Sequence, residues 1–226
     1  MTNHKRKVEQ QPTLKLYYFD IKGKGEPIRR FCAYAGLELE DYRFTSRDEF
    51  LKLKEDGTLS FGQVPMLEVD GKHRLVQTAA ILRYLAKISG LYPEDPLLAA
   101  KVDAIMDQET DAFVGPTVVS YSSRYGIAMD DEHKAKSNEL IAAEIIPRHL
   151  TFAENMLHNS PTGWIAGTEE PSPADFLWHA RMVDYLPEYK GLPDKLAHME
   201  DYPACKKFVE RMSALEAVQE YLQKSK

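Results

Sequence analysis

One stretch, residues 61–86 with the sequence FGQVPMLEVDGKHRLVQTAAILRYLA, constrains the fold most strongly. Residues 64–69 and 73–76 have the apolar pattern of short strands, and they flank the dipeptide Asp70-Gly71. Asp-Gly is a strong hairpin signal, because both central residues of the tight turn that joins two antiparallel strands need positive φ. The stretch therefore predicts a β-hairpin over residues 64–76.

A helix is predicted directly after this hairpin. Apolar residues recur at helical spacing up to Gly90, and Thr78 is placed to cap the helix start. The first turn of a helix leaves N–H groups unsatisfied and carries partial positive charge, so it binds carboxylate or phosphate groups. The pattern alone fits two interpretations of Gln77-Thr78: an ordinary helix cap or a binding site.

Pro65 adds a constraint to the first hairpin strand. A proline without an N–H is tolerated only at a strand start, at an edge or at a bulge. The backbone of Val64 is then available to pair with something outside the protein, and a cis Val64-Pro65 bond would turn its amide and carbonyl outward. An ordinary edge-strand proline is the alternative.

Composition excludes several classes of protein. A chain of 226 residues that is 43% hydrophobic can bury a full core in one large or two small domains. Its net charge of −6 gives no basic footprint for nucleic acid or an anionic membrane, and no apolar run approaches the roughly 18 residues of a membrane span. Only Cys32 and Cys205 occur, which fits the cytoplasm. The seven histidines show no paired ligand spacing, so no metal is expected.

The first part of the chain after a flexible tail (residues 1–12) alternates strands and helices. Residues 15–19 have the pattern of a strand in which Leu14, Leu16 and Tyr18 share one face, followed by the loop Gly23-Lys24-Gly25 and a helix that begins near Pro27 and ends at Gly36. A strand over residues 38–44, parallel to the first, and a charged helical segment over residues 47–57 lead into the hairpin.

The order βαβα-ββα over residues 13–90 predicts a thioredoxin-like α/β domain, with helices packed on one sheet. A thiol–disulfide reductase of this fold needs a cysteine where the first strand passes into the first helix. Residues 20–26 (DIKGKGE) contain none, and Tyr18 stands where the chemistry would be. A reductase is therefore disfavoured.

A second, all-helical domain is predicted over residues 97–226, after a linker at residues 91–96. Helical patterns cover residues 97–125, bent at Gly115-Pro116, and residues 131–159. A third helix begins near Pro173, where Ser172 and Asp175 are spaced as an N-cap and a capping acid. Residues 202–211 and 214–223 are shorter amphipathic candidates.

Five motifs in this order carry a resemblance to a known family: LYYFDIKGKGEPIRR, FGQVPMLEVDG, VQTAAILRYLA, VDAIMDQETDAF and PSPADF. The chain resembles cytosolic glutathione transferases over residues 14 to about 224, and is most similar to the sigma class, which includes the glutathione-dependent prostaglandin D synthases. The resemblance implies the glutathione transferase fold, a homodimer and glutathione as co-substrate. It implies transfer of glutathione to apolar electrophiles, with peroxidase or isomerase activity as related reactions.

The resemblance also implies roles for individual residues. Tyr18 matches the catalytic tyrosine, whose hydroxyl donates a hydrogen bond to sulfur and so favours the nucleophilic thiolate. The implied glutathione-binding residues are Tyr18, Lys24, Phe50, Lys54, Gln63, Val64, Pro65, Gln77, Thr78 and Asp111.

Each part of glutathione has its implied contacts. Gln63 and Val64 would hold the cysteinyl backbone, with Pro65 as the family's cis proline, and Gln77 and Thr78 would hold the γ-glutamyl carboxylate. The glycine end would be gripped by Phe50 and Lys54. Asp111 would reach across the dimer to the partner's ligand, although its acidic helix face is also typical of a solvated surface.

Two residues depart from the family pattern. Lys24 stands where the sigma pattern has arginine, and an ammonium does not reproduce a planar fork of donors. Thr78 replaces serine and keeps the hydroxyl. The acceptor pocket is expected between the domains, with Phe19, Ile21 and Val114 as its lining. The alternative to an enzyme is a non-catalytic structural protein or ligand carrier of the same fold.

Overall fold

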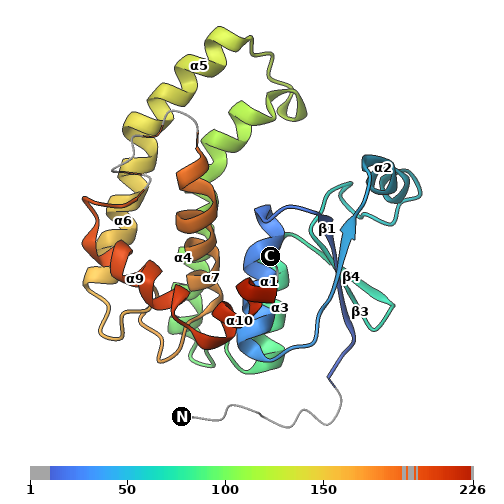
Figure 1. Cartoon of the computed structure of the whole chain (residues 1–226), viewed down its shortest axis with the longest axis horizontal. Coiled ribbons are helices and arrows are strands. Elements are labelled where there is room, and N and C mark those ends of the chain that lie inside the picture. Colours follow the sequence, from blue (N-terminus) through green and yellow to red (C-terminus); the bar gives the residue numbers. More distant parts are fainter. Residues whose placement is uncertain (1–10, 190–191, 193–195, 197, 225–226) are drawn as a thin grey trace. The chain divides into compact units, whose positions relative to one another are not determined.

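The computed structural model describes residues 11–189, 192, 196 and 198–224, and it contains two compact units (Figure 1). The first joins the described residues up to Tyr92 with those from Ala214 onward, and the second is Pro93–Ser213. The division falls within the expected linker at residues 91–96. Most of the expected tail, residues 1–10, lies outside the described residues.

The first unit has the thioredoxin-like order expected from the sequence. Its elements are β1 (Leu14–Phe19), the 3-10 turn η1 (Gly23–Gly25), α1 (Glu26–Ala35), β2 (Glu40–Phe44), α2 (Arg47–Glu55), β3 (Met66–Val69), β4 (His73–Val76) and α3 (Thr78–Ser89). The sheet order is β2-β1-β3-β4, with β1 parallel to β2 and antiparallel to β3. The predicted parallel pair is confirmed, although β2 begins at Glu40 rather than at residue 38.

The hairpin forms as predicted around Asp70-Gly71. These two residues have φ of 53° and 64°, and β3 pairs antiparallel with β4 across them. The first strand is shorter than expected, because β3 begins at Met66 and Pro65 lies just outside it. A residue without an N–H has no donor for the ladder, so the strand begins after it.

The buried face of β1 forms part of the core of this unit. Leu14, Leu16 and Tyr18 are buried on one face of β1 while the alternate residues are part-exposed, as the sequence pattern predicts. Helix α1 ends at Gly36, which has φ of 66° and donates its N–H to carbonyls of the last turn. Helix α1 packs against α3.

The second unit is helical throughout its described residues. It consists of α4 (Pro96–Ser120), the 3-10 turn η2 (Ser122–Tyr125), α5 (Asp131–Leu140), the π-helical turn η3 (Ile141–Ile145), α6 (Ile146–His158), α7 (Pro173–Ala180), the π-helical turn η4 (Arg181–Tyr185), the 3-10 turn η5 (Leu186–Glu188) and α9 (Pro203–Ser213). Pro116 lies inside α4, which continues to Ser120 before the 3-10 turn replaces the rest of the predicted helix.

The start of α7 confirms the predicted N-cap. Ser172 is the N-cap residue and the fully buried Asp175 is the capping acid. Asp175 accepts hydrogen bonds of 2.8 Å from the backbone N–H groups of Ile165 and Ser172. One carboxylate therefore holds the chain that enters α7 and the segment before it.

The last helix, α10 (Glu216–Lys224), belongs to the first unit. Residues 214–226 were expected in the helical domain, but α10 packs against α1, and Val218 is fully buried. A helical pattern identifies the helix and not its partner, because the partner is set by contacts distant in sequence. None of the helices in the described residues combines the length and apolar character that crossing a membrane requires.

Candidate active site

Tyr18 is the last inward residue of β1, and the loop after the strand closes over its ring. Its side chain is buried. A Cβ atom at Gly23 would lie 2.7 Å from Tyr18 Oη, and one at Gly25 would lie 2.8 Å from Tyr18 Cδ1. A side chain at either position would collide with the ring, so the two glycines of the Gly23-Lys24-Gly25 loop are what permits this close approach.

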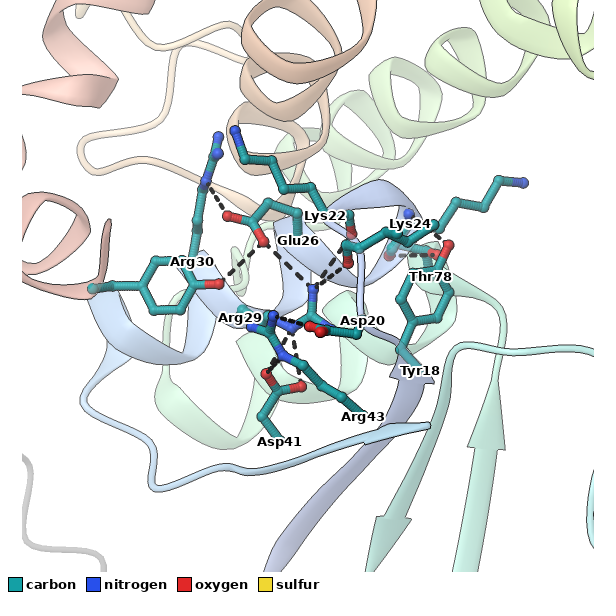
Figure 2. Close-up of polar contacts among 12 residues, drawn as sticks. Tyr18, Asp20, Lys22, Lys24, Glu26, Arg29, Arg30, Asp41, Arg43 and Thr78 are labelled. Atoms are coloured by element: carbon teal, nitrogen blue, oxygen red, sulfur yellow. Dashed lines mark hydrogen bonds and ion pairs between the residues drawn. The ribbon is translucent and has the colours of Figure 1, made fainter. Parts of the chain in front are cut away.

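The same loop holds the phenol oxygen by its backbone. The N–H of Lys24 donates a 2.9 Å hydrogen bond to Tyr18 Oη, while Lys24 itself is exposed (Figure 2). Thr78 Oγ1 in turn donates to the carbonyl of Lys24 at 3.2 Å. The loop thus connects the end of β1 to the start of α3, and three of the expected site residues come together.

The start of α3 differs from the predicted cap. Gln77 is the N-cap residue, because its carbonyl accepts the first helical hydrogen bond from Ile81, and Thr78 is the first helical residue. Thr78 gives its hydroxyl to the loop instead of to the helix. The Gln77 side chain makes no capping bond, and its backbone has φ of 74°. The first-turn amides of a helix can bind an anion, and non-glycine residues with positive φ cluster at functional sites.

The segment before β3 supplies the next group of expected residues. The Val64–Pro65 peptide bond is cis, as the resemblance implies. Gln63 is exposed, Val64 is half-buried and Pro65 is buried. A Cβ atom at Gly62 would lie 3.1 Å from Lys54 Cε, so the Lys54 side chain runs beside the residue that precedes Gln63.

Helix α2 is attached to the sheet by an aromatic cluster. The ring of Phe50 lies 5.2 Å from that of Phe19 and 6.1 Å from that of Phe44, measured between centroids. Phe19, expected in the acceptor pocket, therefore packs against α2 and the second strand. Ile21, the other expected pocket residue of this unit, is 57% exposed.

Asp111 and Val114 lie in the second unit, on α4. Asp111 is exposed, and Val114 is 51% exposed. Burial lowers the pKa of the nearby His149, an effect that the charge of Asp111 opposes. The expected acidic residue and the expected apolar residue are thus both accessible on one helix.

A buried charge cluster beneath the loop was not predicted from the sequence. Glu26, Arg29 and Arg30 at the start of α1 are each at most 3% exposed. Arg29 Nε donates to both carboxylate oxygens of Asp41, and Arg29 Nη1 donates to the carbonyl of Ile21 at 3.0 Å (Figure 2). The only sequence signal was the spacing of Glu26 three and four residues before two arginines, which on most helices marks a surface ion pair.

Neither thiol of the chain is placed for chemistry. Cys32 and Cys205 are buried and form no disulfide, and burial raises the pKa of the Cys32 thiol to about 12. A thiol with so high a pKa is not a nucleophile near neutral pH. Across the described ranges, no three His, Cys, Asp or Glu side chains gather in a group that could hold a metal ion.

Comparisons of sequence and of structure with known proteins identify the same family. Family models described as "Glutathione S-transferase, N-terminal domain" and "Glutathione S-transferase, C-terminal domain" match residues 14–87 and 120–225. The chain is 35% identical to glutathione S-transferase S1 of Drosophila melanogaster over 92% of this chain and 77% of that protein. It is 33% identical to glutathione S-transferase A3 of Mus musculus, over 86% and 87% of the two chains.

A solved structure shows the same fold. The structure of prostaglandin synthase D of Nilaparvata lugens superposes with a TM-score of 0.80 at 26% identity and covers 95% of this chain and 100% of that one. The two domain matches follow the order in which the thioredoxin-like and helical parts occur here. On these grounds the chain belongs to the glutathione S-transferase family.

Proposed function

We propose that this chain binds glutathione in its first unit, favours the thiolate form with the hydroxyl of Tyr18, and promotes attack of that sulfur on apolar electrophiles. The observation that carries the proposal is the fixed position of Tyr18 Oη, which accepts a 2.9 Å hydrogen bond from the Lys24 amide. A phenol hydroxyl can donate while it accepts, and an accepted bond strengthens its donation. Tyr18 thus has the chemistry to donate to a thiolate sulfur.

The other contacts of glutathione follow from the same placement. The uncapped start of α3 at Gln77 and Thr78 suits the γ-glutamyl carboxylate, because its first-turn amides are donors. The backbone at Gln63 and Val64 would pair with the cysteinyl residue beside the cis Pro65. We assign the glycine carboxylate to the ammonium of Lys54 on α2. Phe50, which packs against Phe19, keeps that helix in place.

The reaction does not require a side chain that accepts the proton of the glutathione thiol. The glutathione thiol loses its proton to solvent on binding, and the hydrogen bond from Tyr18 favours the ionised form. The sulfur lone pair then forms a bond to an electrophilic carbon, and the leaving group departs with the electron pair of the bond that breaks. Ile21 and Val114, both exposed and apolar, suit contacts with an apolar acceptor.

We further propose that the chain is sigma-like, works as a homodimer and resides in the cytoplasm. The similarity to glutathione S-transferase S1 and to a prostaglandin synthase D favours the sigma class, and prostaglandin isomerisation and peroxide reduction are the related reactions to screen. The two unpaired cysteines suit a reducing compartment. The intact set of Tyr18, Pro65 and Gln77 speaks against a non-catalytic carrier.

The proposal is tested by an ultraviolet difference titration of the protein with glutathione across pH. We expect thiolate absorbance to appear with an apparent pKa at least about one unit below that of a free thiol, near 8.5. Saturable binding without a thiolate signal would favour the carrier role, and a mixed disulfide with the protein would favour a reductase. The measurement requires no choice of second substrate.

Asp111→Ala tests the contact that the proposed dimer provides. If Asp111 reaches the glutamyl amino group of the partner's ligand, its removal weakens glutathione affinity by about 5- to 20-fold, the size of one exposed charge-assisted hydrogen bond. Affinity is measured by isothermal titration calorimetry. Asp107→Ala, an exposed carboxylate one turn earlier on α4, is the matched control. Equal affinities for the two variants would disprove the cross-dimer contact.

A further inference from the structure

The charge cluster at the start of α1 has a partner at the far end of the chain. The buried Glu26 carboxylate forms ion pairs with Arg30 at 3.1 Å and Arg29 at 3.5 Å (Figure 2). Its Oε2 also accepts a 3.0 Å hydrogen bond from the hydroxyl of Tyr221 on α10. Glu26 is thus shared between two arginines of its own helix and a tyrosine 195 residues later.

The other side of the cluster holds the loop that covers Tyr18. Arg29 Nη1 donates to the carbonyl of Ile21 at 3.0 Å and to that of Lys22 at 3.4 Å. The guanidinium lies 5.7 Å from the centroid of the Tyr18 ring. The next residues of the loop bring the Lys24 N–H to Tyr18 Oη. A continuous set of contacts therefore runs from Tyr221 through Glu26 and Arg29 to the phenol.

We propose that Tyr221 is a positioning residue for Tyr18, acting through Glu26, Arg29 and the loop of residues 21–25. This inference rests on the proposed function, because it gives α10 a part in activating the glutathione thiol. A buried carboxylate that loses one donor turns toward its remaining partners. For Glu26 these are the two arginines, and a moved Arg29 no longer holds the carbonyls of Ile21 and Lys22 in the same place.

The chemistry at Tyr18 is sensitive to such a movement. A hydrogen bond that stabilises developing charge depends on donor placement to within a fraction of an ångström, and a 1 Å error costs about 100-fold in rate. The loop cannot compensate freely, because Gly23 and Gly25 already lie in close contact with the Tyr18 ring. Loss of the Tyr221 hydroxyl should therefore displace the Tyr18 hydroxyl, because the loop has little room to adjust.

Tyr221→Phe tests the proposal, because it removes only the hydroxyl and keeps the ring. We expect the apparent pKa of the thiol of bound glutathione to rise by about half a unit or more. The kcat for conjugation should fall by about 3- to 10-fold, with little change in the KM for glutathione. Tyr202→Phe is the matched control. Its tyrosine is also half-buried and donates its hydroxyl to Pro147 O at 3.2 Å, but it lies in the second unit. It should leave both quantities unchanged.

A double-mutant cycle shows whether Tyr221 acts through Tyr18. In the Tyr18→Phe background, Tyr221→Phe should have no further effect on kcat, since the donor that it positions is already gone. Multiplicative effects on kcat would overturn the proposal. So would a Tyr221→Phe protein that melts at lower temperature with an unchanged bound-thiol pKa, because the hydroxyl would then serve stability alone.

Amide hydrogen exchange gives a second measurement that needs neither substrate nor turnover. The Lys24 amide, which donates to Tyr18 Oη, should exchange about tenfold faster in Tyr221→Phe than in the wild-type protein. Unchanged exchange would overturn the proposed transmission. Absence of thiolate in the wild-type protein would instead remove the proposed function, so the two failures are distinguishable.

Discussion

Tyr18→Phe should bind glutathione nearly as tightly as the wild-type protein but conjugate it about 10- to 1,000-fold more slowly, the effect of removing one positioned donor. Phenylalanine fills the same buried space beneath Gly23 and Gly25, so the fold is retained. The hydroxyl is lost, and with it the hydrogen bond to sulfur. Steady-state conjugation of a chromogenic electrophile measures the rate, and calorimetry measures the affinity for glutathione.

The neighbouring tyrosine provides the control. Tyr17 lies on the opposite face of β1, where its ring packs 5.1 Å from that of Tyr42 and Lys15 Nζ lies over it. Burial raises the pKa of Tyr17, so its hydroxyl remains protonated at neutral pH. Tyr17→Phe should keep the full rate. A Tyr18→Phe protein that is as active as Tyr17→Phe would transfer the donor role to another group, such as the amide of Lys24.

Asp175→Ala should lower the free energy of unfolding by about 3 to 5 kcal/mol, because it leaves several buried donors without an acceptor. Both backbone N–H groups and the Ser172 hydroxyl, which donates to Asp175 at 2.8 Å, lose their partner at once. Chemical denaturation measures the loss. Asp130→Ala is the control. Asp130 also lies at a helix start, where its carboxylate accepts a 2.8 Å hydrogen bond from the N–H of His133 on α5, but it is exposed. Equal losses for both variants would disprove the larger contribution of Asp175.

The contribution of Asp175 should also depend on pH. Burial raises its pKa from 3.8 to about 6 in the folded protein. Between these two values the folded state binds a proton that the unfolded state has released, so stability falls as pH rises toward about 6 and then levels off. The difference in unfolding free energy between the wild-type and Asp175→Ala proteins should therefore decrease by about 2 kcal/mol from pH 4.5 to 7. A difference that grows over this range would show that the hydrogen bonds to Asp175 outweigh its burial.

Local signals predicted most of the fold because each acts within a few residues. Asp70-Gly71 adopts the positive φ of a hairpin turn, Gly36 ends α1 in the left-handed region, and Asp175 caps α7. In each case the physical requirement and the residue that satisfies it are close in sequence. The alternation of Leu14, Leu16 and Tyr18 is equally local, and it suffices to place the key tyrosine on the buried face of β1.

The site was harder to predict because it depends on backbone groups and on distant partners. Helix α3 begins one residue earlier than the capping pattern indicated, and Thr78 bonds to Lys24, 54 residues away. The group that holds the Tyr18 hydroxyl is the backbone N–H of Lys24. Every residue except proline has such an N–H, so the identity of the side chain at position 24 does not predict this contact. The burial of Arg29 depends on Asp41 and on the loop carbonyls, which a helical charge pattern does not reveal.

The membership of α10 in the first unit also fixes when that unit can be completed during protein synthesis. The ribosome releases the four strands and α1 before the helical unit, but α10, which packs on α1, emerges only after that unit. The whole helical unit is made in between and can fold while α1 still lacks this cover. A polypeptide cut after Tyr92 would thus retain every strand of the sheet and yet leave uncovered the part of α1 against which α10 packs in the intact chain.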